Sequence, residues 1–112
     1  MTTDWTEHYE LETDNRRRAP RINRQFPVQL MDEQERMERG SAVNVSATGA
    51  RLVVRRPCAG EFTLQLDDHT QVLARTVWSQ QMPGYAVVGV EFDVSAAEQR
   101  RSVASFLSRL AA

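Results

Sequence analysis

Hydrophobic and polar residues alternate through most of the chain between residues 26 and 94. This alternation is typical of β-strands that turn one face toward a core. Clusters of turn-forming residues near residues 57–60, 67–68 and 82–84 divide the pattern into six short strands. All but one of these strands have a clear inner face. The residues expected there are Phe26, Val28 and Leu30; Val43 and Val45; Leu52 and Val54; Phe62, Leu64 and Leu66; and Ala86, Val88, Val90, Phe92 and Val94.

The fifth strand, residues 70–79, has hydrophobic residues at both positions of the alternation, so the sequence leaves its inner face undecided. The chain then changes to a helical period, because Val103, Phe106, Leu107 and Leu110 recur on one helical face. The preceding Ser95-Ala96-Ala97-Glu98 matches a capping box. We therefore expect a helix over residues 96–110. The predicted fold is mainly β, a six-stranded antiparallel β-barrel with a C-terminal α-helix packed on it or closing one end.

Length and composition are those of one globular domain. The chain has 112 residues, of which 41% are hydrophobic and 26% are charged. No apolar run is long enough to cross a membrane, and the N-terminus lacks the features of a secretory signal, so we expect no membrane insertion. Cys58 is the only cysteine, which excludes a disulfide framework. These features favour a cytoplasmic location.

Charge is unevenly distributed although the net charge is only -1. Residues 1–15 carry acidic groups and no basic ones, whereas residues 16–24 carry arginines and no acid. We expect residues 1–15 to form a flexible acidic segment and residues 16–112 to form the barrel domain. Every one of the 14 basic residues is an arginine. Arginine presents a planar fork that binds phosphate through two parallel hydrogen bonds and also fits the O6 and N7 edge of guanine.

Two polar stretches are candidates for a binding site. The first is the arginine cluster at residues 16–21, which Pro20 stiffens into an extended arm. The second is the stretch 44–49, Asn-Val-Ser-Ala-Thr-Gly. If Val43 and Val45 face the core, side-chain alternation places Asn44 and Ser46 on the outer wall of the barrel. An asparagine amide can pair with a base edge, and the serine hydroxyl can donate or accept.

Together, these stretches resemble the PilZ domain family. The spacing Arg-Arg-x-x-x-Arg is met by Arg16, Arg17 and Arg21, and Asn-x-Ser-x-x-Gly by Asn44, Ser46 and Gly49, while residues 87–92 resemble the last strand of that family. The resemblance implies a bacterial six-stranded barrel that binds the second messenger cyclic di-GMP. It further implies that Arg17 and Arg21 bind phosphates and guanine edges, with Arg16 and Arg18 as supporting cations. Asn44 and Ser46 would contact a guanine, and Gly49 would permit the turn, either through a positive φ or by leaving room for the ligand.

Several other residues allow both a functional and a structural interpretation. Trp78 either stacks on a guanine or packs in the core or against the helix. A second Arg-x-x-x-Arg match, Arg51 to Arg55, lies within a predicted strand and lacks a preceding arginine, so it is set aside. Asp67-Asp68-His69 is interpreted as a solvated turn and Cys58 as a small filler, so no metal site is expected.

The expected function is that of a non-enzymatic receptor with no cofactor, because the sequence shows neither clustered metal-binding residues nor a Gly-rich phosphate loop. Ligand binding is expected to change its conformation and to signal to a downstream protein partner. We also expect the acidic segment 1–15 to lie near the arginine arm until the ligand displaces it. Two alternatives remain: a PilZ-like adaptor that acts through protein contacts without ligand, and a small nucleic-acid-binding barrel, against which the net acidity and the missing aromatic stripe argue.

Overall fold

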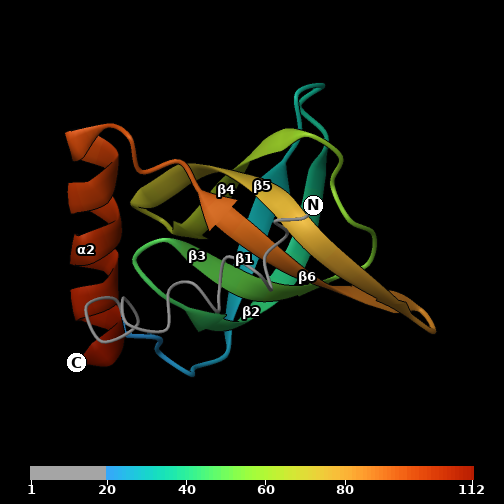
Figure 1. Cartoon of the computed structure of the whole chain (residues 1–112), viewed down its shortest axis with the longest axis horizontal. Coiled ribbons are helices and arrows are strands. Elements are labelled where there is room, and N and C mark those ends of the chain that lie inside the picture. The colour runs from blue at the N-terminus through green and yellow to red at the C-terminus, as the bar shows by residue number, and fades with distance from the viewer. Residues whose placement is uncertain (1–19) are drawn as a thin grey trace.

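The computed structural model describes residues 20–112, which form one closed β-barrel and a C-terminal helix (Figure 1). The elements are β1 (Phe26–Met31), β2 (Met37–Val45), β3 (Gly49–Val54), β4 (Glu61–Asp67), β5 (Thr70–Met82), β6 (Tyr85–Phe92) and α2 (Ala97–Ala111). Neighbouring strands pair antiparallel, and the order around the barrel is β1-β2-β3-β6-β5-β4. The predicted fold class is therefore confirmed. The arginines at positions 16, 17 and 18 lie outside the described residues.

The core fills the inside of the barrel with alternate side chains from every strand. Most of the inward-facing residues expected from the alternation are buried, while Phe26 and Val94 are half-buried and pack against the core. The prediction for β2 is wrong at Val43, which is only half-buried, whereas Ala42 and Val45 are fully buried. The reason is a β-bulge between Ala42 and Asn44, which inserts one residue and shifts the alternation.

A second bulge explains the undecided face of β5. Val72 and Ala74 point into the core, as the buried fraction of their side chains shows. The pairing with β6 shifts between Thr76 and Trp78, so Val77 is the extra residue. Beyond it the alternation is reversed, and Trp78 lies on the outer wall although it has the same parity as the inward residues before the bulge.

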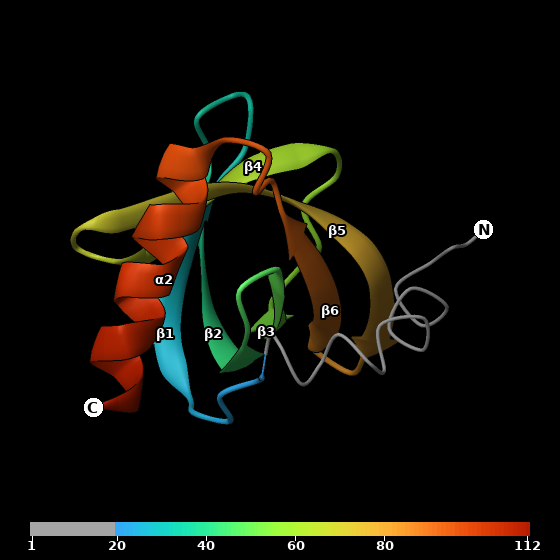
Figure 2. The same ribbon diagram turned by 60° about the vertical axis from the view of Figure 1, so that its left-hand side comes forward.

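Helix α2 lies beside the barrel near the start of β1 (Figure 2). Val103 and Phe106 of its apolar stripe are buried, and the Phe106 ring contacts the Phe26 ring with centroids 5.3 Å apart. The capping-box prediction is wrong. The N-cap is Ala96 without a side-chain hydrogen bond, because the Ser95 hydroxyl instead donates to Asp93 Oδ1 at 2.7 Å.

A polar contact fixes the other end of the helix to the β4–β5 turn. Arg109 Nη2 donates to Asp67 Oδ2 at 2.9 Å and to Thr70 Oγ1 at 3.0 Å. Burial alone would raise the pKa of Asp67, but hydrogen bonds from Arg109, from the His69 N–H and from Thr70 outweigh it and lower that pKa below its ordinary value. The Asp67 carboxylate is therefore part of the contact that holds α2 on the barrel. No helix within residues 20–112 is long and apolar enough to cross a membrane.

Candidate ligand-binding site

Strand register brings four residues from four strands into one row on the outer wall of the barrel. Asn44 of β2 lies opposite Arg51 of β3. Arg51 lies opposite Gly89 of β6, and Gly89 lies opposite Trp78 of β5. Directly opposed residues in antiparallel strands direct their side chains to the same face. Because the next residues along, Leu52 and Val88, are buried in the core, this row faces outward.

The segment before β1 places Arg21 at the β2 end of this row. Ile22 and Val45 form an isolated antiparallel bridge, with N to O distances of 2.8 and 3.1 Å. This bridge holds the half-buried Arg21 beside Asn44, and Arg21 Nη1 donates to Asn44 Oδ1 at 2.9 Å. One predicted arginine and one predicted polar residue of the turn motif are thus in direct contact, although 23 residues separate them in the sequence.

Ser46 and Gly49 build the turn beneath the row. The Ser46 N–H donates to the Gly49 carbonyl at 2.8 Å, and the Ser46 hydroxyl accepts from the Thr48 N–H at 3.3 Å. The expectation that Ser46 faces outward is wrong, because it is only 3% exposed; β2 ends at Val45 and the side chain folds into the turn. Gly49 begins β3 and does not have a positive φ, so it does not permit the turn through a left-handed backbone conformation. A guanine contact by Ser46 stays a prediction.

Trp78 forms a flat apolar surface at the other end of the row. Its indole lies on Gly89, where a Cβ atom would come within 2.1 Å of Nε1. The Arg51 guanidinium carbon lies 5.4 Å from the indole ring centroid, within the range of a cation–π contact. Indole Nε1 is buried and has no hydrogen-bond partner among residues 20–112. Trp78 is therefore on the outer wall next to a cation and not in the barrel interior.

Arg51 and Gly89 belong to the outer-wall row although no sequence motif indicated them. Arg51 begins the second Arg-x-x-x-Arg match, which lies in a strand, and its position in β3 directs its side chain outward beside Asn44. Gly89 interrupts the β-branched run of β6, which was the available signal for a close approach by another group. The register of β6 with β3 and β5 joins both residues to Trp78, and the alternation of hydrophobic and polar residues does not reveal this register.

The turn at residues 67–69 and Cys58, the other polar candidates, do not form a ligand site. The Asp67 carboxylate accepts from the His69 N–H at 2.8 Å within the β4–β5 turn. Burial raises the pKa of the half-buried Cys58 thiol, which disfavours the reactive thiolate. In the part of the chain from residue 20 onward, no three histidine, cysteine, aspartate or glutamate side chains gather in a group that could hold a metal ion.

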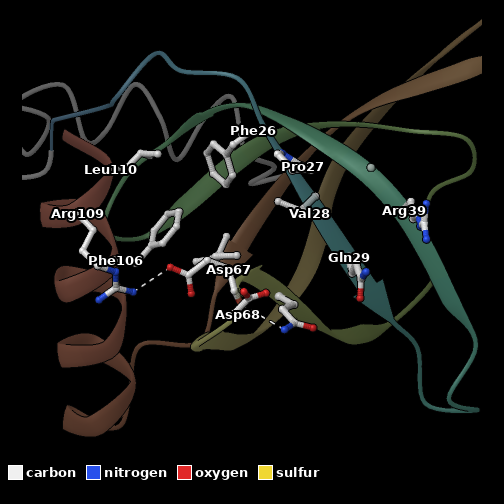
Figure 3. A pocket seen from close by; sticks show the side chains of 13 residues that line it. Phe26, Pro27, Val28, Gln29, Arg39, Asp67, Asp68, Phe106, Arg109 and Leu110 are labelled. Atoms are coloured by element: carbon white, nitrogen blue, oxygen red, sulfur yellow. Dashed lines mark hydrogen bonds and ion pairs between the residues drawn. The ribbon is translucent and has the colours of Figure 1, made fainter. Parts of the chain in front are cut away.

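A separate cavity of about 640 Å³ lies between α2, β1 and β4 (Figure 3). Phe26, Phe106 and Leu110 give it an apolar side, and the ion pair of Arg109 with Asp67 is part of its lining (Figure 3). Among residues 20–112, none of those predicted to bind ligand lines this cavity. The outer-wall row and the cavity are therefore distinct places on the molecule.

Comparisons with known proteins point to one domain type. The family model described as the PilZ domain matches residues 15–109. The PilZ domain of YcgR from Escherichia coli, a structure with c-di-GMP, has a TM-score of 0.60 at 11% identity, covering 85% of this chain and 91% of that one. The PilZ domain of CeSA from a cellulose-synthesizing bacterium has a TM-score of 0.55 at 16% identity, over 82% and 98%.

The inhibitor of motility MotI/DgrA from Bacillus subtilis is also similar, with a TM-score of 0.60 at 19% identity, covering 84% of this chain and 50% of that one. At these identities the structural matches show the fold. No curated protein sequence matches the chain.

Proposed function

Because the chain belongs to the PilZ domain family, we propose that it is a receptor for cyclic di-GMP, which binds on the outer wall of the barrel across Asn44, Arg51 and Trp78. The observation that carries the proposal is the contact between Arg21 and Asn44, at 2.9 Å, at one end of a row that has an indole at the other. A guanine dinucleotide offers phosphates, base edges and base faces, and the row offers a matching group for each.

Arg21 and Asn44 supply the polar recognition. Arg21 Nη1 donates to Asn44 Oδ1, and this hydrogen bond fixes the orientation of the Asn44 amide. A guanidinium group suits a phosphate or the guanine O6 and N7 edge. The arginines at positions 16, 17 and 18 precede this point directly in the chain and would add charge around the two phosphates.

Trp78 and Arg51 supply the flat surfaces. An indole and a guanidinium can each stack on a purine face, and the two groups already lie 5.4 Å apart. Gly89 allows the indole to lie flat against the strand. The buried Ser46 would act through the turn that holds Asn44 and β3 in place.

Signalling would follow from ordering of the arginine arm. The arm leads directly into the bridge between Ile22 and Val45, so ligand contacts at Arg21 act on a segment that is already fixed to β2. The acidic residues 1–15 adjoin the arginines and would compete with an anionic ligand for them. The domain then acts as a non-enzymatic cytoplasmic receptor whose ligand-bound surface is offered to a downstream protein partner.

Isothermal titration calorimetry with cyclic di-GMP tests the proposal, with linear guanine dinucleotide as the control ligand. Arg21→Ala should weaken binding by about 1.5–3 kcal/mol, roughly tenfold to over a hundredfold, because a charge-assisted hydrogen bond is lost. Arg75→Ala is the control, since Arg75 is an arginine on the outer wall that is paired with Glu91 at 2.8 Å. Wild-type protein that gives no saturable heat would overturn the proposal and favour the ligand-free adaptor. A steep salt dependence with single-stranded nucleic acid instead would favour the nucleic-acid barrel.

A further inference from the structure

The hairpin of β5 and β6 extends beyond the barrel (Figure 1). β4 pairs with β5 only as far as Glu61 opposite Arg75. β5 continues to Met82, and along this extension it pairs with β6 on one side. Within residues 20–112 no strand pairs with the other side of this extension. The extension of β5 therefore presents an open strand edge.

This edge carries neither charged side chains nor proline, two features that commonly protect an open strand. Alternate residues of an edge strand direct their N–H and C=O groups away from the paired neighbour. Natural edges are commonly shielded by charged side chains or by proline. Residues 76–82 contain neither, although 26% of the chain is charged. Ser79, Gln80 and Gln81 are exposed, and the segment is bounded by the bulge at Val77 and by Pro83.

We propose that a second copy of this chain pairs with this edge, so that the two β5 strands run antiparallel about a two-fold axis at Gln80. In a two-fold antiparallel pair, opposed residues must share a face, so the register is centred on a residue. Gln80 is the midpoint of the segment from Trp78 to Met82, which gives the longest overlap between the bulge and the proline. Each Gln80 then lies opposite Gln80 of the second copy.

In that register, the side chains of one copy are complementary to those of the other. Trp78, Gln80 and Met82 share the outer face, because they pair with Gly89, Val87 and Tyr85 of β6 in alternation with the other face. Trp78 of one copy would lie opposite Met82 of the other, a favourable contact between sulfur and an aromatic ring. The two amides of Gln80 would lie opposite each other, where each can donate and accept.

A second copy fits this edge better than a strand of another composition. The segment offers no charge that would select an acidic or basic partner, whereas an identical segment brings no unpaired charge to the interface. A pair of short strands buries less area than a standard stable interface. Association is therefore expected to be reversible and dependent on protein concentration.

Sedimentation equilibrium of the whole chain tests this proposal without any ligand. Wild-type protein should shift from monomer toward dimer between about 10 µM and about 1 mM, the range of a weak interface. Gln80→Lys should remain monomeric at every concentration, because it places two like charges opposite each other. Gln71→Lys is the matched control, since Gln71 is exposed on the same strand but lies where β5 is paired with β4.

A mixing experiment tests the register itself. Gln80→Glu should also be monomeric alone, and an equimolar mixture with Gln80→Lys should dimerise again, because opposite charges meet only if residue 80 faces residue 80. Thermal unfolding of each variant confirms that it is folded. A wild-type protein that stays monomeric, a Gln80→Lys protein that still dimerises, or a mixture that stays monomeric would overturn the proposal. None of these results depends on whether cyclic di-GMP binds.

Discussion

Gly89 determines whether Trp78 can lie flat on the outer wall, and Gly89→Ala tests this. A Cβ atom at residue 89 would lie 2.1 Å from Trp78 Nε1, 2.5 Å from Cε2 and 2.8 Å from Cδ1. Ordinary contacts begin near 3.4 Å, so the ring must move by more than about 1 Å. Because Trp78 lies at the surface, the ring can swing outward, and we expect a stability loss near the lower end of overpacking costs, about 1 kcal/mol.

Displacing the indole should weaken ligand binding more than it weakens the fold. Stacking of a base on an aromatic side chain contributes about 1–3 kcal/mol. Its loss corresponds to roughly fivefold to 150-fold weaker binding of cyclic di-GMP. The measurement is a calorimetric titration of Gly89→Ala and wild-type protein, combined with the fluorescence of Trp78. The chain has two tryptophans, so fluorescence is recorded in a Trp5→Phe background.

Val87→Ile provides the control, because it adds one carbon at the next outward position of β6. That variant should bind with wild-type affinity and leave the Trp78 emission unchanged. A Gly89→Ala protein with unchanged emission and unchanged affinity would refute the argument that Gly89 seats the indole and that the indole contacts the ligand. Changed emission with unchanged affinity would retain the packing argument and remove Trp78 from the site.

Three further predictions concern the helix and the acidic segment. Phe106→Ala should lower the free energy of unfolding by about 3–5 kcal/mol, measured by chemical denaturation, because the ring is buried against Phe26. The folded-state pKa of Asp67 is lowered, so its stabilisation is complete above the ordinary value of 3.8 and is lost as the pH falls through the folded-state value. Arg109→Ala should therefore make thermal stability less dependent on pH below about pH 4, and an unchanged pH profile would contradict this. Deletion of residues 2–14 should tighten binding of cyclic di-GMP at low salt, and equal or weaker affinity would refute competition by that segment.

Much of the barrel was predictable because each strand must bury every second side chain. The inner faces of β1, β3, β4 and β6 follow directly from this rule. β2 and β5 did not follow it throughout, since the bulges at Val43 and Val77 each insert one residue. A bulge depends on which backbone groups pair between strands, and the sequence of one strand does not contain that information.

The candidate site was predictable in part for a similar reason. The contact of Arg21 with Asn44 joins two motifs that the sequence already singled out. Arg51 joins them only through the register of β2 with β3, and Trp78 only through the register of β6 with its two neighbours. Ser46 was misplaced because alternation was extended one residue past the end of the strand.

The central claim is that cyclic di-GMP binds across the outer-wall row. The most direct test is a nuclear magnetic resonance titration of isotopically labelled protein with cyclic di-GMP, following backbone amides and the indole N–H. The account predicts the largest shifts at Asn44, Arg51, Gly89 and the Trp78 indole, saturating with the affinity measured by calorimetry. Shifts confined to the cavity around Phe106 and Leu110, or no saturable shifts at all, would contradict it.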